Sequence, residues 1–585
     1  MSTEIGSTEE GDDFLPDSVG ELTEDVTEAY DELDIPKRQY VGYVLVPSAV
    51  FFLVTLVVAL FTNFAILIRL PLAGLGGLIF VAAVVYPKLY LNSKKVAIEN
   101  KLHLVMTHMT VLSTTNIDRM EVFRTLAEEE EYDAAAEEIA TVVHLVDTWN
   151  QSLDDALRRR AQQVPSDNLS DFFDRLGYTI GAGQELADFL LSEQDSVMQN
   201  YITVYEGALG NLEVMKDLYM SMILSMTFAL VFAIVLPILT GNNPTLTVSS
   251  VIVLFMLVQL GFYIAIRAMA PYDPVWFHSE AGAPNDEVLF GSFVVGVLST
   301  FATIAFVGLG VFDMGPGIRG ILFFLDNIPL PLYIAVPITP MAITGIVLRI
   351  EENRIKSRDE QFPSFIRALG AAESAKQSTT GDVLETLHRK DFGPLTPAVV
   401  RLYRRLNIRI DSSNAWYTFA SDTRSYLIQK FSGMYLQGRA MGGDPGQLGE
   451  LISDNMTTVC QLRQQRDQAT LTLVGLLYGI TAASSFAFFI GLQIVNILAD
   501  FSEQLNISTV GSVGRIIYAG VYNIPLIEFL LLLVILFNAV LSSVMIRTID
   551  GGNKANAYLH FVLLTWVGAL TAIGTKALVT AVLSI

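Results

Sequence analysis

Residues 522–546 read YNIPLIEFLLLLVILFNAVLSSVMI, a stretch of 25 residues in which Glu528 is the one charged side chain. About 20 consecutive apolar residues are enough for a helix to cross the hydrocarbon core of a bilayer. Of the 585 residues in the chain, 52% are hydrophobic, and the mean hydropathy is +0.46. These values indicate an integral membrane protein and exclude an ordinary soluble one.

Hydropathy predicts eight further segments of this kind. The nine predicted membrane helices lie near residues 41–61, 70–90, 218–239, 248–270, 289–310, 328–348, 470–497, 522–546 and 558–582. They form three groups, at 41–90, 218–348 and 470–585, which two long polar stretches separate. Both polar stretches, 91–217 and 349–469, are rich in helix-forming residues. We expect an all-α polytopic membrane protein with about nine transmembrane helices and two helical-bundle domains.

The N-terminal segment, residues 1–40, differs from the rest in composition. It holds thirteen acidic residues between Glu4 and Asp34, and its basic residues are Lys37 and Arg38. It lacks the basic start and apolar core of a cleavable signal peptide. Such a segment repels itself, and we expect an acidic disordered tail.

The positive charges beside the membrane segments predict the orientation of the chain, because cytoplasmic flanks are enriched in Lys and Arg. With the N-terminus inside, the cytoplasmic flanks carry Lys37, Arg38, Lys88, Lys94, Lys95, Lys216, Arg267, Arg349, Arg354, Arg463, Arg466, Arg547 and Lys554. The opposite side carries Arg69, Arg319, Arg515 and Lys576. We therefore expect a multi-pass protein of the cell membrane whose N-terminus and two polar domains are cytoplasmic.

The two polar domains share a pattern at a nearly constant spacing. The apolar helix face Leu102, Val105, Met106, Met109 recurs 260 positions later as Phe362, Phe365, Ile366, Leu369. Two further sets recur 261 positions later: Val122, Phe123, Leu126 as Val383, Leu384, Leu387, and Gly177, Gly181 as Gly438, Gly442. Three landmarks at a nearly constant spacing indicate an internal duplication. Four membrane crossings separate the copies, so both copies are expected on the same side.

The charge balance is strongly acidic. The chain has 60 Asp and Glu against 37 Lys and Arg, a net charge of −23, and the bases comprise 12 Lys and 25 Arg. Dense carboxylates with few lysines suit a cytoplasm with molar salt, which predicts a haloarchaeal source. The polar domains differ: 91–217 has 23 acids and 10 bases, whereas 349–469 has 14 acids and 17 bases. The second domain is therefore the positively charged one.

Several motifs within the two copies resemble those of the type II secretion F-domain superfamily. They are Ser-Leu-Asp-Asp-Ala-Leu at 152–157, Gly-Ala-Gly-Gln-Glu-Leu at 181–186, Phe-Pro-Ser-Phe-Ile at 362–366 and Met-Gly-Gly-Asp-Pro-Gly at 441–446. At 411–416 the second copy has Asp-Ser-Ser-Asn-Ala-Trp, a poor match to the first motif. The layout over 95–585 is similar to that of the archaellum (archaeal flagellum) platform family of the FlaJ type. The stretch 107–132 is the part that resembles this family most.

This resemblance implies a scaffold in the cytoplasmic membrane that takes part in type IV pilus-like assembly and motility. The implied partners are a cytosolic hexameric secretion-type ATPase, archaellin or pilin subunits, other archaellum motor components, membrane lipid and a second copy in a homodimer, with no nucleic acid. The ATPase would couple to insertion of filament subunits. An adhesion-pilus platform in archaea shares this plan and stays open as an alternative. A secondary transporter with repeats is a further alternative.

The chain has no recognisable catalytic or cofactor-binding motif. It lacks the Gly-rich phosphate loop of an ATPase. Its six histidines are dispersed, and Cys460 is its one cysteine. We therefore expect a protein that is not an enzyme and has neither catalytic residues, cofactor nor metal.

Two sets of charged residues are candidates for function. Arg401, Arg404, Arg405 and Arg409 are spaced to share one helical face,. This stripe is predicted to bind an acidic partner, such as the motor ATPase or the Glu128–Glu131 run of the first polar domain. The alternatives are a solvated face or attraction to anionic lipid heads near the membrane.

The second set consists of two opposite charges in membrane segments, Glu528 and Lys576. An unpaired charge in a bilayer is costly, so an intramembrane ion pair between them is predicted. A proton path is the alternative.

Overall fold

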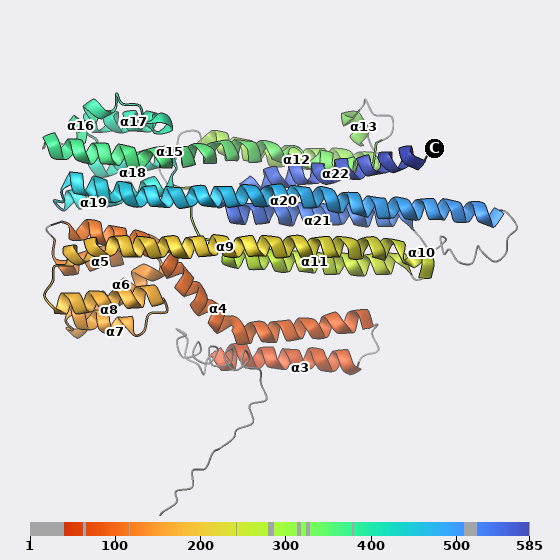
Figure 1. Ribbon diagram of the computed structural model, residues 1–585, viewed down its shortest axis with the longest axis horizontal. Helices are drawn as coiled ribbons and strands as arrows, with labels where there is room; N and C mark the ends of the chain where they lie inside the picture. Colours follow the sequence, from red (N-terminus) through yellow and green to blue (C-terminus); the bar gives the residue numbers. More distant parts are fainter. Residues whose placement is uncertain are drawn as a thin grey trace, which may run out of the picture. The chain divides into compact units, whose positions relative to one another are not determined.

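The structure is a computed structural model that describes residues 40–61, 66–115, 117–240, 243–278, 286–312, 317–322, 328–376, 380–507 and 523–583. These residues are almost entirely helical. The β-type backbone pairing among them is an isolated antiparallel bridge between Trp276 and Ser425. Figure 1 shows the long helices of the chain. The all-α membrane class is confirmed. The predicted acidic tail lies, apart from Tyr40, outside the described residues.

Seven helices in the described residues are long and apolar enough to cross a membrane, or eight if one bent pair counts as a span. The seven lie in η1 with α3 (Val41–Leu45 and Val46–Phe61), α9 (Leu186–Val235), α11 (Pro244–Met269), α12 (Asp286–Val311), α20 (Pro445–Ile507), α21 (Ile524–Asp550) and η5 with α22 (Lys554–Asn556 and Ala557–Leu583). The helix predicted at 70–90 lies in α4 (Ile66–Ser113) and is not among them. The number nine therefore remains a prediction.

The segment predicted as one helix at 328–348 is broken. It consists of α14 (Leu332–Ile338) and the start of α15 (Met341–Lys376), which meet at an angle of 49°. Pro337 lies within α14 and Pro340 directly precedes α15. Proline has no amide hydrogen and its ring clashes with the preceding turn, which explains the break. Two short helices, α10 (Pro237–Thr240) and α13 (Gly317–Ile321), accompany the membrane helices.

The chain divides into two compact units, Met1–Met109 with Ile117–Glu193 and Thr110–Asn116 with Gln194–Ile585. The polar part of the first unit contains the end of α4, then α5 (Arg119–Ala127), η2 (Glu130–Tyr132), α6 (Ala134–Trp149), α7 (Leu153–Ala161), α8 (Asp167–Gly181) and the start of α9. The predicted apolar face of α4 is buried, with Val105 and Met106 at most 1% exposed. Phe123, Phe172 and Phe173 extend this core.

The polar part of the second unit is a bundle formed by the end of α15, α16 (Thr380–Leu387), η3 (Gly393–Leu395), α17 (Thr396–Asn407), α18 (Ser412–Thr423), α19 (Tyr426–Ala440) and the start of α20. Its core is aromatic. Phe365 contacts Trp416 and Phe419 with ring centroids 6.4 and 5.9 Å apart, and Phe362 also packs there. The predicted face of α15 is therefore a core face.

Two long helices, α15 and α20, run without interruption from this bundle into the apolar part of the second unit, and they pack side by side (Figure 1). At a rise of 1.5 Å per residue, the 63 residues of α20 extend about 95 Å,. In its apolar half α20 packs against α21 and α22. Buried polar contacts join these helices: Gln259 of α11 donates to Asn538 of α21 at 2.5 Å, and Asn538 donates to Thr481 of α20 at 3.0 Å.

The helix ends recur in both polar stretches. Ser152 and Asp411, 259 positions apart, cap α7 and α18 through the third residue that follows each. Ser166 and Ser425, again 259 apart, cap α8 and α19 in the same way. These side chains satisfy amide groups that the first helical turn leaves without partners. The poor sequence match at 411–416 therefore has the same local geometry as the motif at 152–157.

The glycines after these helices pair differently from the sequence prediction. Gly183 and Gly442 have φ of +83° and +91°, follow α8 and α19, and lie 259 positions apart. The amide of each donates to a carbonyl three residues earlier. Glycine is favoured there because a Cβ disfavours the left-handed region. Gly442 therefore has the same place after its helix as Gly183, whereas Gly181 is the last residue of α8, so the helix ends do not support the predicted pairing of Gly181 with Gly442.

Gly177 and Gly438 lie inside α8 and α19, where neighbours come close. A Cβ on Gly177 would lie 2.9 Å from the Arg158 side chain, and one on Gly438 would lie 2.8 Å from Val111. These glycines therefore serve helix packing.

Candidate functional site

The predicted arginine stripe is partly used inside the second bundle. The Arg401 Nε and Arg405 Nη1 atoms both donate to Oδ2 of Asp422, at 2.8 and 2.7 Å. The Asp422 side chain is only 5% exposed, so these contacts hold α17 against the end of α18. Two of the four arginines therefore have a structural role within the domain.

The other two arginines are exposed, and one of them is not on the predicted helix face. Arg404 lies on α17, but α17 ends at Asn407, and Arg409 follows it with φ of +60°. Asn150, 259 positions earlier, likewise follows its helix, α6, with φ of +54°. Because the backbone turns there, the prediction that all four arginines share one helix face is wrong.

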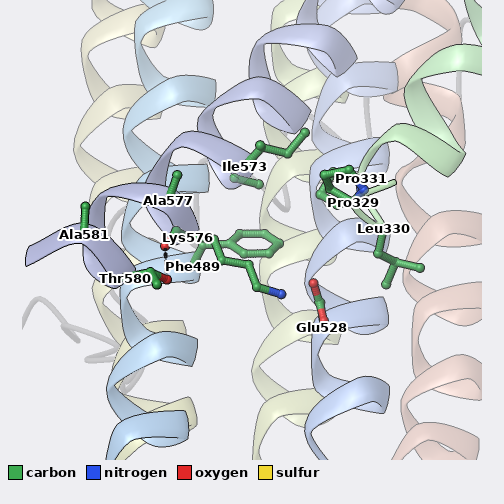
Figure 2. Close-up of a pocket in the computed structure, with 11 residues that line it drawn as sticks. Pro329, Leu330, Pro331, Phe489, Glu528, Ile573, Lys576, Ala577, Thr580 and Ala581 are labelled. Atoms are coloured by element: carbon green, nitrogen blue, oxygen red, sulfur yellow. Dashed lines mark hydrogen bonds between the residues drawn. The ribbon is translucent and has the colours of Figure 1, made fainter. Parts of the chain in front are cut away.

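Glu528 of α21 and Lys576 of α22 line one pocket of about 460 Å³. Figure 2 shows the two side chains on different walls of this pocket. No ion pair within 4.0 Å joins them among the described residues. The structure brings the predicted partners together, and a direct ion pair between them stays a prediction.

A cluster of charged side chains, most of them buried, lies where the second bundle meets its membrane helices. We call it the charged junction, and it consists of Asp273, Arg349, Glu352, Lys356, Asp359, Arg463, Arg466 and Asp550. One component is the linker between α11 and α12, which forms an isolated bridge with the turn between α18 and α19. The amide of Phe277 donates to the carbonyl of Arg424 at 2.8 Å, and the amide of Tyr426 donates to the carbonyl of Val275 at 3.1 Å. A membrane linker is thus joined to the polar bundle through backbone hydrogen bonds.

Arg463 of α20 is the centre of the charged junction. Its Nε and Nη2 atoms donate to both carboxylate oxygens of Asp273 at 2.6 and 2.5 Å, and Nη2 also donates to the carbonyl of Pro274 at 2.9 Å. Its Nη1 atom donates to Asp359 of α15 at 2.7 Å. The Arg463 side chain is 7% exposed. One guanidinium therefore joins α15, α20 and the α11–α12 linker, in the two-pronged geometry that arginine favours with carboxylates.

Asp359 connects this centre to α19. The hydroxyl of Ser425, which caps α19, donates to the second oxygen of Asp359. Asp359 lies in the polar part of α15, nine residues after Ile350. Burial raises the pKa of Asp359 to about 6, and Arg463 opposes that rise by favouring the charged form,.

Glu352 of α15 binds the loop between α21 and α22. Its Oε2 atom accepts hydrogen bonds from the amide of Asn553 at 3.0 Å and from the side chain of Asn556 at 2.6 Å. The indole of Trp276 donates to the same oxygen at 2.9 Å. Gly552, with φ of +81°, passes so close that a Cβ there would overlap the Glu352 carboxylate. The Glu352 side chain is fully buried and thus joins three separate segments.

The end of α21 is held by basic groups. Arg466 of α20 donates from Nε to the carbonyl of Ile549 at 2.5 Å, which satisfies a carbonyl that the helix end leaves free,. Asp550 forms ion pairs with Arg349 and, at 3.5 Å, with Lys356. Lys356 also forms an ion pair with Asp467 of α20, at 2.7 Å. These contacts fix the end of α21 against α15 and α20.

The chemistry of the charged junction is that of structural ion pairs. Its acids face arginines and lysines, and the described residues contain no group of three or more His, Cys, Asp or Glu side chains placed to hold a metal. Removing one partner of such a buried pair is costly because it leaves an uncompensated charge. These pairs therefore hold the polar bundle against the ends of the neighbouring membrane helices.

Sequence reasoning missed the charged junction. A signal was present: Asp273 and Glu352 directly follow apolar segments, and Asp550 ends another. Their partners are far away in the sequence, with Arg463 separated from Asp273 by 190 positions. Such pairs require the three-dimensional packing of α15 and α20 to be known.

The comparisons with known proteins agree with this architecture. Residues 105–235 match the model of the family "Type II secretion system (T2SS), protein F". This match covers the first polar stretch from residue 105 onward and the rest of α9. No solved structure matches the chain significantly.

Two curated relatives match nearly the whole chain. Flagella accessory protein J of Methanocaldococcus jannaschii is 32% identical over 550 residues, 94% of this chain and 96% of the relative. Flagella accessory protein J of Methanococcus voltae is 32% identical over 545 residues, 92% of this chain and 96% of the relative. Since similarity at this level extends over almost the full length of both relatives, the chain belongs to the family of Flagella accessory protein J.

Proposed function

We propose that this protein is the cell-membrane platform on which an archaellum is assembled. In this proposal a cytosolic secretion-type ATPase acts on the polar helical domains, and the membrane helices pass the resulting movement to filament subunits that enter the growing base. The names of the two relatives favour the archaellum over an adhesion pilus. The work is mechanical, so the proposal requires no catalytic group or cofactor in this chain.

One observation carries the proposal: α15 and α20 continue from the second bundle into the apolar part of the molecule, and the charged junction ties them to the ends of neighbouring membrane helices. A continuous helix transmits displacement along its axis. The buried ion pairs around Arg463 would keep the linker before α12 moving with these helices. The bundle and its membrane helices would therefore move as one body.

The recurring helix ends at spacings of 259 support the inference that the two polar stretches are duplicated domains. With the predicted orientation, both would face the cytoplasm, where the ATPase acts. The homodimer and the high-salt cytoplasm remain part of the proposal. In molar salt the Debye length is about 3 Å, so docking there relies on close contacts.

Arg404 and Arg409 are the exposed members of the arginine stripe and are proposed to bind the ATPase. Arginine makes two-pronged contacts with carboxylates, which resist screening better than single contacts. Replacing both by glutamate should reduce co-purification of the ATPase with the platform. Arg367→Glu is the control, because Arg367 is an exposed arginine on α15 of the same bundle. Equal ATPase recovery from all three proteins would exclude this docking surface.

The function is tested by deleting the gene and restoring it on a plasmid. The proposal predicts that deletion abolishes swimming and surface archaella while adhesion to glass persists. The wild-type gene on the plasmid should restore swimming and archaella. Loss of adhesion with normal swimming would instead identify an adhesion-pilus platform. Normal swimming and adhesion would refute an assembly role and favour a transporter.

A further inference from the structure

The pocket between Glu528 and Lys576 lies at the ends of membrane helices that are remote from the charged junction. Glu528 is in the second turn of α21, which ends at the junction with Asp550. Lys576 is near the end of α22, which begins beside the junction at Ala557. With the charged junction at one membrane surface, these helix ends would reach the other surface, where lipid head groups meet the first carbons of their chains.

The walls of the pocket combine apolar surface with two opposite charges. Leu330, Phe489 and Ile573 contribute apolar surface from three segments of the chain (Figure 2). Neither the Glu528 carboxylate nor the Lys576 ammonium group forms a hydrogen bond or ion pair with a described residue within 4.0 Å. Charged side chains in membrane segments are costly unless they have a partner. A ligand that contacts both charges would remove that cost.

We propose that this pocket binds an anionic glycerophospholipid whose head group carries a hydroxyl. The phosphate would accept hydrogen bonds from Lys576, the head-group hydroxyl would donate to Glu528, and the first part of a lipid chain would lie along Phe489 and Ile573. The volume of about 460 Å³ accommodates a head group and only part of a chain,. An apolar partner helix would leave both charges without partners, which is why the charge pattern favours a lipid.

The proposal is tested by native mass spectrometry on the purified full-length protein in detergent. Phosphatidylglycerol is titrated in, and phosphatidylcholine and phosphatidic acid are titrated separately. The wild-type protein should retain phosphatidylglycerol in preference to phosphatidylcholine. Lys576→Gln should weaken phosphatidylglycerol retention about tenfold, the loss expected for one charge-assisted hydrogen bond. Lys576→Arg should keep retention within about threefold of the wild type, because it keeps the charge.

A matched control removes a lysine elsewhere. Lys554 lies in η5, directly before α22 and near the charged junction, and it is exposed like Lys576. Lys554→Gln should leave phosphatidylglycerol retention unchanged, and thermal unfolding verifies that each variant is folded. Glu528→Gln tests the second contact: it should weaken phosphatidylglycerol but improve phosphatidic acid, whose exposed phosphate is repelled by a carboxylate.

Three outcomes would overturn the proposal. They are equal retention of phosphatidylglycerol by the wild type and Lys576→Gln, equal retention of phosphatidylglycerol and phosphatidylcholine by the wild type, and a loss in Lys554→Gln as large as that in Lys576→Gln. The second outcome is the one that an apolar partner helix in this pocket would give.

Discussion

Replacing Arg463 by methionine should destabilise the folded protein by about 3–5 kcal/mol, the cost of removing one partner from a buried ion pair. Arg463 makes four hydrogen bonds, three to Asp273 and Asp359 and one to the carbonyl of Pro274, and its side chain is 7% exposed. Methionine keeps much of the apolar volume. The loss therefore comes from two carboxylates left buried without their cation.

The matched control is Arg367→Met. Arg367 of α15 pairs with Asp454 of α20, so it links the same two helices as the contact between Arg463 and Asp359. The Arg367 and Asp454 side chains are 53% and 61% exposed. Exposed pairs of this kind contribute at most about 1 kcal/mol, because water screens them. The two variants thus differ in burial while sharing residue type and helix pair.

The measurement is the free energy of unfolding of each full-length protein in the same detergent, from guanidinium titrations followed by circular dichroism. The wild-type protein should have the highest free energy of unfolding. The value for Arg367→Met should be close to it, and the value for Arg463→Met should be far lower. Costs for the two variants that agree within about 1 kcal/mol would refute the idea that the charged junction is a buried structural centre.

Three further predictions concern the same molecule. Gly552→Ala should lower the melting temperature, because its Cβ would overlap the Glu352 carboxylate and its φ is +81°; an unchanged melting temperature would contradict that close approach. Because the pKa of Asp359 is raised to about 6 from 3.8, the folded protein takes up this proton before the unfolded chain does. Its contribution to stability therefore increases as the pH falls from about 6 to 4, and the stability of Asp359→Asn relative to wild type should decrease over that window; a flat difference would exclude the shift. The Arg404→Glu, Arg409→Glu double variant should keep wild-type stability while losing ATPase, which separates docking from folding.

The helical membrane class and the family were predictable from the sequence because they rest on local signals. A charge-poor stretch such as 522–546 predicts a spanning helix, and α21 occupies it. The spacing of Phe362, Phe365 and Ile366 predicts a core face, and all three are fully buried. Hydropathy and helical periodicity depend on neighbours within a few turns, so a single sequence carries them.

The charged junction was not predictable because its contacts depend on long-range packing. Nothing near Asp273 in the sequence indicates that Arg463 will bind it. The prediction that all four arginines share one helix face was wrong for a local reason. Arg409 lies after the end of α17 and has a left-handed backbone conformation, which helical spacing does not reveal. The pairing of Gly181 with Gly442 assumed one constant spacing, whereas the helix ends give 259 positions for Gly183 and Gly442.

A cytosolic ATPase can act on both polar domains only if both face the cytoplasm. The side of the membrane on which each domain lies can be measured by labelling single cysteines. Single cysteines replace Trp149, Ile408 and, as a control predicted to lie outside, Phe312, all of which are exposed. Native Cys460 is buried. Intact cells treated with a membrane-impermeant maleimide should label Phe312→Cys alone, and lysed cells should label all three. Labelling of Trp149→Cys or Ile408→Cys in intact cells would place a polar domain outside and contradict the account.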